Sequence, residues 1–438
     1  MIKKLKNVAL IAFTANFLAC NTDSANKKSE NDSLQTSVKK ADTAKQSELF
    51  DKNSFKDAKL DEGAKKLAQK HNLFAMDLYK QMMVKDSNVF FSPTSVYSIL
   101  GVNLLASQEK TKAELEKLLY TQSDANTAKN FYNLFGHLYQ INQDTTYKFN
   151  IANAIWVNKD ISLKTEFTDL IKKNFEFQIK SGDFKNPELV KVINEWVNKN
   201  TRGTIPSIIE ALDPDTKLAM LNAIYMKAPW AEAFNENQTQ EKTFYLKGKD
   251  TTKAMFMHKY EANLSYTEDA LWQVVELPYK NDRISMFIAL PKVKNQIQNI
   301  QNQINTNKIE AWEKAMKSEL TNLSMPKFTI RTDVINISEF LDKMGVKEAF
   351  SGTANFKLMF DNNTSMPLGQ IFHKAFINVN EKETEASAVT IELKTEEARE
   401  IPIPKEFHAN HPFVFWIKEK ESGMILFMGR LDNPSLQK

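Results

Sequence analysis

The order in which helical and strand patterns follow one another limits the fold of this chain more than any other feature. Apolar residues recur at roughly helical spacing over residues 67–82, and a second helix is predicted after Pro93. Alternating apolar residues over 149–157 then indicate a strand, and residues 271–290 are typical of a β-hairpin that turns at 280–282. The first part of the chain is therefore predicted to be helical, with strands following it.

Three segments in the last third of the chain are also predicted strands. Residues 371–379 form the first, while 413–417 and 424–429 are joined by a short turn. No internal repeat and no low-complexity linker divides the body of the chain. The sequence therefore predicts one large mixed α+β domain over residues 61–438.

Residues 111–114, Thr-Lys-Ala-Glu, have the spacing of a capping box. In that motif the threonine side chain accepts a hydrogen bond from the backbone N–H of the glutamate, and the glutamate side chain accepts one from the backbone N–H of the threonine. With Leu115, Leu118 and Leu119 behind it, the pattern predicts that a third helix opens at this point.

The N-terminus has the features of a bacterial lipoprotein signal rather than of a folded element. Lys3, Lys4 and Lys6 precede an apolar run over residues 8–17, which ends in Leu-Ala-Cys at Cys20. We expect residues 1–19 to be removed and the Cys20 thiol to carry a diacylglycerol. The protein would then be exported and lipid-anchored to the cell envelope, at the outer membrane, on its periplasmic or its surface face.

Residues 20–60 are predicted to be a disordered tether. They are rich in Ser, Asn, Asp, Lys and Thr and have too few large apolar side chains to offset the entropy of ordering. The formal net charge of the chain is +4, and removal of the three signal lysines leaves +1. So small a charge gives no electrostatic reason to expect nucleic-acid binding.

The sequence offers little for catalysis, for a metal or for a cofactor. It has six histidines and no H-E-x-x-H motif, and His408 and His411 would point to opposite faces of an extended chain. No G-x-S-x-G motif or P-loop is present, and Cys20 is the single cysteine. We therefore expect no enzyme activity, no cofactor and no metal.

Residues 381–390, EKETEASAVT, follow a predicted strand and are unusually rich in small and β-forming side chains. Small side chains allow a segment to enter between existing strands, and β-branched ones favour an extended backbone. An ordinary edge strand followed by a loop would explain the same pattern. The residues alone do not decide between these alternatives.

Residues 407–417, FHANHPFVFWI, resemble the C-terminal signature of the serpin family at each of its defined positions. Residues 381–390 resemble the hinge of that family's reactive loop. Further matches follow in the family's order: residues 91–95 resemble the start of its second helix, 222–230 a strand of its central sheet, and 373–375 the strand before the hinge. The resemblance implies a fold of three β-sheets and about nine helices, with an exposed reactive-centre loop.

The resemblance also implies a suicide inhibitor of serine or cysteine endopeptidases, which acts as a monomer. An enzyme that has acylated the cut loop is carried away as the loop inserts into the central sheet. The implied hinge residues are Glu381, Glu383, Thr384, Glu385, Ala386, Ser387, Ala388, Val389 and Thr390, of which Thr384, Ala386 and Ala388 would face inward. The residues implied at the opening of the sheet are Ser92, Ser95, Asn222, His373, Trp230 and Lys327.

The reactive bond implied by the family's spacing from the hinge is Glu397–Ala398. Arg399–Glu400 and Lys394–Thr395 are basic alternatives that would suit trypsin-like enzymes. The hinge also departs from inhibitory members, which usually have glycine where this chain has Glu383. A non-inhibitory serpin that acts as a binding or carrier protein therefore remains the alternative function.

Overall fold

A computed structural model describes residues 55–83, 87–142, 146–175, 177–361, 366–382 and 402–436, all within one unit, Lys52–Lys438. The predicted signal, Cys20 and most of the predicted tether lie outside the described residues, as do the hinge and loop residues 383–401. Among the helices of the described ranges, none is long and apolar enough to cross a membrane.

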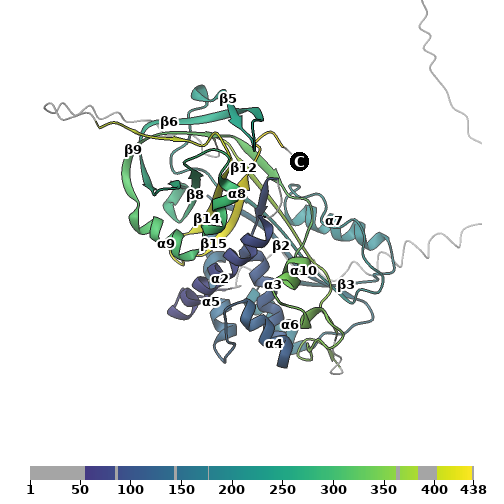
Figure 1. Ribbon diagram of the computed structural model, residues 1–438. Helices are drawn as coiled ribbons and strands as arrows, with labels where there is room; N and C mark the ends of the chain where they lie inside the picture. The colour runs from purple at the N-terminus through teal and green to yellow at the C-terminus, as the bar shows by residue number, and fades with distance from the viewer. Residues whose placement is uncertain are drawn as a thin grey trace, which may run out of the picture. The chain divides into compact units, whose positions relative to one another are not determined.

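The described ranges contain nine α-helices, as the sequence led us to expect. Five of them precede β3 (Gln178–Gly182) in the sequence and four follow it (Figure 1). They are α2 (Glu62–Met82), α3 (Pro93–Ala106), α4 (Glu109–Leu118), α5 (Thr127–Asn142), α6 (Thr165–Phe175), α7 (Glu188–Asn200), α8 (Ile297–Ile300), α9 (Thr306–Ala315) and α10 (Ser338–Lys343).

A six-stranded sheet contains the strands that concern the candidate site. Its order is β10-β12-β4-β2-β3, and β11 also pairs with β12. The strands are β2 (Lys148–Asn158), β3 (Gln178–Gly182), β4 (Leu218–Lys227), β10 (Phe328–Arg331), β11 (Ile335–Asn336) and β12 (Ile371–Val379). The β10·β12 and β2·β4 pairs are antiparallel, whereas β12 and β4 run parallel to each other.

The second sheet has nine strands, in the order β1-β15-β14-β8-β7-β6-β9-β13, with β5 paired to β6. Its strands are β1 (Val89–Phe91), β5 (Gln240–Tyr245), β6 (Thr251–Glu268), β7 (Trp272–Pro278), β8 (Ile284–Pro291), β9 (Lys317–Pro326), β13 (Lys405–His408), β14 (Phe413–Glu419) and β15 (Ile425–Leu431).

Three sheets were expected, but the strands form two hydrogen-bonded sheets, because β6 belongs to two of the expected sheets at once. The register between β6 and β9 shifts between Lys259 and Ala262, where Glu261 has a positive φ of 49°. One half of β6 pairs with β5 and the other half with β7, so two sheet portions are continuous through this irregular strand.

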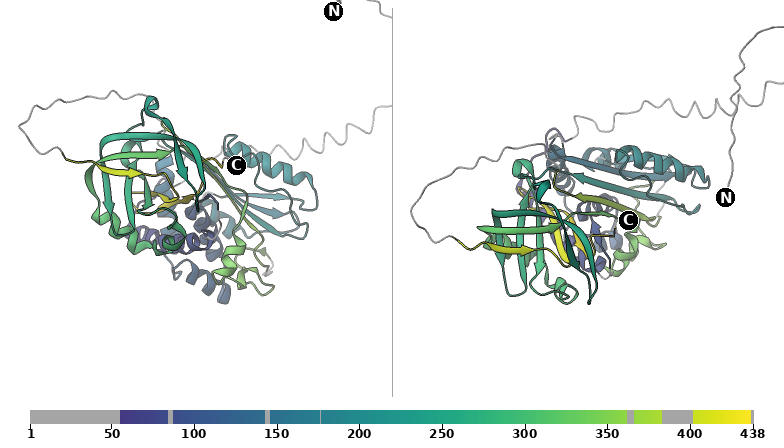
Figure 2. Two further views of the ribbon diagram at one scale, coloured as in Figure 1. Left: turned by 45° about the horizontal axis from the view of Figure 1, so that its top comes forward. Right: turned by 90° about the horizontal axis from the view of Figure 1, so that it is seen from above.

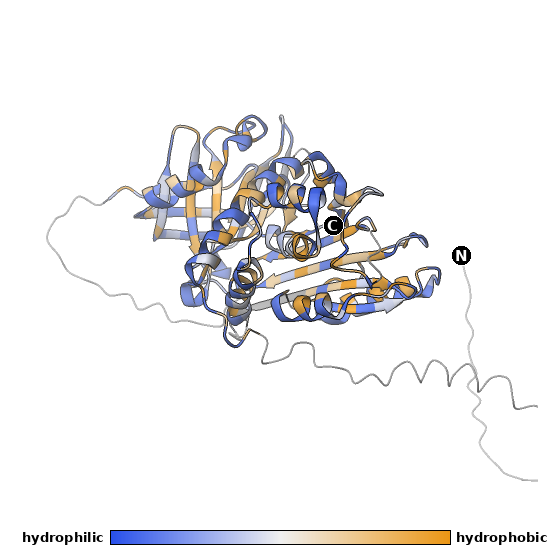
Figure 3. Cartoon of the chain, turned by 90° about the horizontal axis from the view of Figure 1, so that it is seen from below, coloured by the Kyte–Doolittle hydropathy of each residue, from blue (hydrophilic) through white to orange (hydrophobic). Residues whose placement is uncertain are grey.

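Helices cover both faces of the six-stranded sheet. On one face, Leu189, Ile193 and Val197 of α7 pack with alternate residues of β2 and β4. On the other face α3 contributes to the largest core cluster, together with Leu218 and Met220 of β4. Figure 2 shows α7 lying along the strands, and Figure 3 shows hydrophobic residues concentrated on the strands and on the helix faces toward them.

The predicted capping box was wrong, because α4 begins one turn earlier, at Glu109. Thr111 Oγ1 accepts a hydrogen bond from Asn355 N (2.9 Å), and the Glu114 carboxylate accepts from Lys347 N (2.9 Å) and Glu348 N (2.7 Å). Both side chains therefore satisfy backbone groups of a neighbouring segment. The same spacing of Thr and Glu suits one face of a helix interior as well as its first turn.

The packed body begins before residue 61, where the sequence analysis ended the tether. Phe55 and Ala58 are buried, and the ring of Phe55 lies 5.3 Å from that of Tyr132 and 5.5 Å from that of Tyr139 in α5. These two apolar residues stand singly in a polar stretch, so composition alone could not assign them to the core.

A candidate functional site where β4 and β12 meet

His373 and Asn222 face each other across the parallel pair β12·β4. Nδ1 of His373 lies 2.7 Å from Oδ1 of Asn222, and Nε2 lies 3.1 Å from the backbone N of Ser92. Asn222 in turn donates from Nδ2 to Oδ1 of Asn153 on β2, at 2.5 Å. A chain of polar contacts therefore runs across three strands of the sheet.

Ser92 connects this chain to a helix and to the second sheet. Its Oγ accepts from the backbone N of Ser95 (3.2 Å) and so caps α3, and it also donates to the carbonyl of Leu426 in β15 (2.9 Å). Ser92 therefore caps a helix and also takes part in the sheet cluster. Ser95 joins the cluster through its backbone N–H.

The hydrogen bonds of His373 fix its protonation state. A backbone N–H can only donate, so Nε2 must be the unprotonated acceptor and Nδ1 must carry the proton donated to Asn222. Burial lowers the pKa of His373 to about 3, because an imidazolium would have no water around it. The ring is therefore neutral at physiological pH, and the cluster carries no net charge.

A second group of contacts lies just beyond the C-terminal end of β12. The carboxylate of Glu381 is buried, 2.8 Å from Lys327 Nζ, and it accepts a hydrogen bond from Thr239 Oγ1 at 2.6 Å. Burial would raise the pKa of Glu381, but the bonds from Lys327 and Thr239 outweigh it and hold the pKa below its usual value. We call Glu381, Lys327 and Thr239 the latch.

Trp230 lies beside the latch and contacts the same end of β12. Its Nε1 donates to the carbonyl of Asn380 at 2.9 Å, and its ring stacks on Tyr279 at 4.6 Å. The tryptophan is buried between β12 and the second sheet. Trp230 therefore contacts the chain at the point where it leaves the strand toward residue 383.

The structure separates the implied sheet-opening residues into two places. Ser92, Ser95, Asn222 and His373 come together near the start of β12, whereas Trp230 and Lys327 lie at its other end, beside the implied hinge residue Glu381. About eight residues of extended chain, or roughly 26 Å, separate the two places. Asn153 and Thr239 also take part in these contacts but were not predicted from the sequence. Neither belongs to a motif: Asn153 is placed by the register of β2 with β4, and Thr239 lies in a loop.

The β4·β12 ladder between these two places is unbroken. Seven residues of β12, from Ile371 to Ile377, pair in register with residues Met220 to Met226 of β4. The chain leaves β12 at Lys382 and is described again from Pro402, before β13 pairs with β9 in the other sheet. The implied hinge from Glu383 to Thr390 and all implied reactive bonds fall between those points, outside the described residues.

His408 and His411, the two histidines considered above as possible metal ligands, contact different residues. His408 is exposed with Nε2 at 2.9 Å from Glu406, whereas His411 is buried and donates from Nε2 to the carbonyl of Pro291 at 2.8 Å. The described residues do contain one group that can supply three metal ligands, namely His137, Glu419 and Glu421. No sequence motif pointed to this group, because α5 and the β14–β15 turn are far apart along the chain.

Comparison with known proteins places the whole body of the chain in one group. Residues 69–434 match the family model described as serpin, a serine protease inhibitor. An uncharacterized serpin-like protein of Thermococcus kodakarensis is 32% identical, over 83% of this chain and 84% of its own length. A leukocyte elastase inhibitor of Xenopus laevis is 32% identical, over 82% of this chain and 97% of its own.

The fold matches solved structures of the same group. The Arabidopsis protein AtSerpin1, solved in its native stressed conformation, superposes with a TM-score of 0.75 at 26% identity, over 85% of this chain and 98% of that one.

Proposed function

Because this chain belongs to the serpin family, we propose that it is a suicide inhibitor of serine or cysteine endopeptidases. The relative from Xenopus laevis is named for inhibition of an elastase, and the family model is described by inhibition of serine proteases. Members of the family are generally inhibitors rather than catalysts. The partner of this chain would thus be a protease that cuts the segment after Lys382.

The observation that carries the proposal is the parallel pairing of β4 with β12. A segment that leaves the C-terminal end of β12 and turns back would run antiparallel to β12, and for the same reason antiparallel to β4. Its insertion would exchange one parallel ladder of seven residue pairs for two antiparallel ladders. The sheet would then gain backbone hydrogen bonds worth about 1 kcal/mol each.

The two groups of contacts described above would control this exchange. The latch and Trp230 hold the start of the loop at one end of β12, while the His373–Asn222 bond joins β12 to β4 near the other end. A segment entering from the latch would open the pairs in order until it reached His373. With a turn at about residues 381–382, Thr390 would stand beside His373 and Ala386 beside Ile377, so that the even-numbered positions face the core, and Glu392 and Lys394 would come at the far end of the ladder.

The chemical step belongs to the protease. Its nucleophile would attack the carbonyl carbon of Glu397, the Glu397–Ala398 bond would break, and the amine of Ala398 would leave with a proton. The acyl-enzyme would normally be hydrolysed by water. Insertion of the loop would carry the enzyme away from its acylation geometry before that step, and so convert a substrate into a trap.

A carrier function is the second candidate, supported by Glu383. Inhibitory members usually have glycine there, and the Cβ of any other residue restricts the backbone of a hinge that must change its conformation. A carrier would bind its ligand without needing insertion. It would form no covalent complex with any protease.

The deciding experiment mixes the protein with a panel of serine and cysteine proteases and looks for complexes that survive boiling in detergent. Such a complex supports inhibition, and mass analysis of its cleaved fragment distinguishes Glu397–Ala398 from the two basic alternatives. If every protease in the panel either ignores the protein or degrades it without forming a complex, the inhibitory proposal fails.

A substitution in the hinge tests the insertion step itself. Ala386→Arg is expected to turn the inhibitor into a substrate, because position 386 would face the core after insertion and an unpaired guanidinium opposes burial. A rise of about 1.4 kcal/mol in the insertion barrier slows it tenfold and favours hydrolysis. Ser387→Arg is the matched control, since position 387 would face the opposite way. Equal numbers of inhibitor molecules consumed per protease in both variants would contradict insertion through this hinge.

We also propose that the protein is exported and anchored through a lipid on Cys20. The basic residues, apolar run and small residue before the cysteine support this assignment. Cys20→Ser should release the protein from the membrane fraction, because one lost acyl anchor leaves the chain without membrane affinity. A variant that still sediments with membranes would contradict it.

A further inference from the structure

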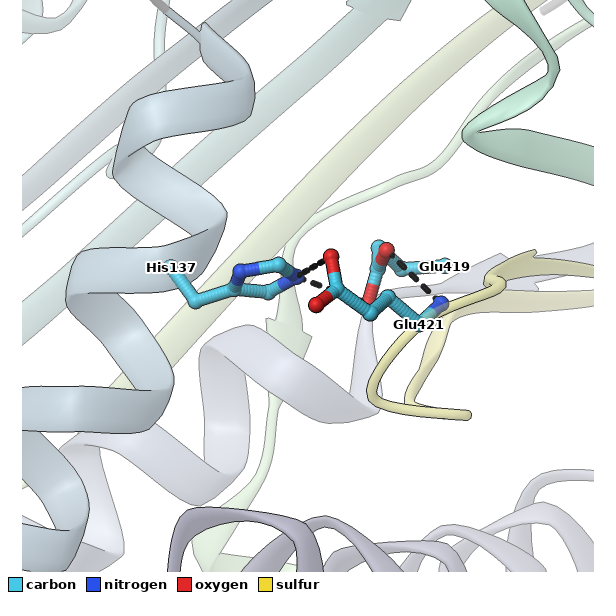
Figure 4. Close-up of side chains that lie close together, drawn as sticks. All are labelled: His137, Glu419 and Glu421. Atoms are coloured by element: carbon cyan, nitrogen blue, oxygen red, sulfur yellow. Dashed lines mark hydrogen bonds and ion pairs between the residues drawn. The ribbon is translucent and has the colours of Figure 1, made fainter. Parts of the chain in front are cut away.

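His137, Glu419 and Glu421 converge from two distant elements of the fold. His137 lies in α5, Glu419 is the last residue of β14, and Glu421 lies in the turn before β15. Nε2 of His137 is 3.2 Å from Glu419 Oε2 and 3.9 Å from Glu421 Oε2. Figure 4 shows the imidazole pointing from the helix toward both carboxylates.

The side chains of His137 and Glu419 are deeply buried, 6% and 1% exposed, while that of Glu421 is 64% exposed. His137 Nε2 is shielded from water and, despite its short distance to Glu419, has no hydrogen-bond partner of acceptable geometry among the described residues. Buried polar atoms in this state are rare and call for an explanation. The acidic oxygens nearest to this nitrogen are one from each of the two carboxylates.

The charge of the two carboxylates is not balanced by the lysines that flank Glu419. Lys418 Nζ lies 2.6 Å from Glu313, and Lys420 Nζ lies within 3 Å of both Glu276 and Asp282. Glu419 is held instead by backbone N–H groups of Glu421 and Ser422 and by the Ser422 hydroxyl. These bonds fix the orientation of the carboxylate but bring no positive charge.

We propose that His137, Glu419 and Glu421 bind a divalent zinc ion. Three ligand atoms of a tetrahedral zinc site lie about 3.4 Å from one another, given bonds of about 2.0–2.2 Å. The three atoms here all lie within 4.8 Å of one another, so a small movement of the exposed Glu421 side chain closes the site. A water molecule completes the coordination on the solvent side.

The ligand types favour zinc over the hard cations. Imidazole nitrogen is a preferred ligand of Zn²⁺, whereas Mg²⁺ and Ca²⁺ prefer six or more oxygen ligands. A neutral imidazole and two carboxylates also neutralise the two positive charges of the ion. Because His137 lies in α5 and Glu419 ends β14, a bound ion would join this helix to the nine-stranded sheet.

The test is calorimetric titration of zinc chloride into the full chain after treatment with a chelator, in a Cys20→Ser background so that no thiol competes. The proposal predicts about one zinc ion per chain. Glu421→Gln should weaken binding at least tenfold while the fold is kept, because Glu421 is exposed; His137→Gln should weaken it similarly. If His137→Gln is unstable, because His137 is buried, the binding measured with Glu421→Gln decides the test.

Glu406→Gln is the matched control, since Glu406 is an exposed carboxylate 2.9 Å from the exposed His408. It should bind zinc as the parent does. Magnesium chloride at the same concentration should neither bind with comparable heat nor displace zinc. Absence of zinc binding, equal weakening in Glu406→Gln and Glu421→Gln, or equal affinity for magnesium would each overturn the proposal.

Discussion

Burial keeps several histidines of this protein neutral, and His373 is the one placed in the candidate site. Burial lowers the pKa of His373 to about 3 and that of His71 to about 4. His71 is fully buried near the first turn of α3, where Nε2 lies 3.5 Å from Thr94 Oγ1. In the unfolded chain both groups would titrate near pH 6.5.

This difference predicts that the protein loses stability on mild acidification. Below pH 6.5 the unfolded chain binds protons that the folded chain does not, so the free energy of unfolding falls as the pH decreases. At pH 5, protonation of His373 and of His71 in the unfolded chain should each lower the free energy of unfolding by about 2 kcal/mol relative to pH 8. Carboxylates with lowered pKa contribute only at lower pH. Urea midpoints at pH 8, 6.5 and 5 measure the effect, and a midpoint that stays constant would contradict it.

Replacement of His373 should weaken the junction of β4 and β12 directly. His373→Ala leaves Asn222 Oδ1 and the Ser92 N–H buried without this partner, which should lower the free energy of unfolding by about 2–4 kcal/mol. His408→Ala, at an exposed position, should change it by less than about 0.5 kcal/mol. Urea denaturation at pH 8 compares the two variants, and similar midpoints would argue against a structural role of the cluster.

At the scale of elements, the latch fixes the end of β12. A double-mutant cycle on Lys327→Ala and Glu381→Ala should give a coupling of about 1–2 kcal/mol, because Glu381 is buried and depends on Lys327 for its charge. The neighbouring pair Lys382–Glu236 has a similar distance, 2.7 Å, but both side chains are exposed. Its cycle should give less than about 0.5 kcal/mol. Equal couplings in the two cycles would show that burial adds nothing to the latch.

The sequence predicted elements better than the contacts between them. Strand β12 and the β7–β8 and β14–β15 hairpins follow from apolar runs bounded by turn residues, which are local signals. Asn153 reaches the His373 cluster only through the register of β2 with β4, and register is a property of two strands. The prediction of a capping box was wrong for the opposite reason. The local pattern was present, but its side chains bind a segment that is distant in the sequence.

At the scale of the whole molecule, cleavage between residues 391 and 400 should raise the melting temperature markedly. The cut loop could then add a strand between β4 and β12, with new hydrogen bonds and new buried area. Scanning calorimetry of intact and cleaved protein measures the difference. A cleaved protein that melts with the intact one would favour the carrier function.

The pairing of β1 with β15 has a consequence for how the protein is made. Asn88 donates a hydrogen bond to the carbonyl of Asn433, 345 residues further along the chain, and the short strand that follows Asn88 pairs with β15. A ribosome adding about 5–20 residues per second needs on the order of tens of seconds to connect these partners. During that interval β1 lacks its β-strand partner, so the growing chain exposes an unpaired strand that could pair with other chains until its final residues emerge.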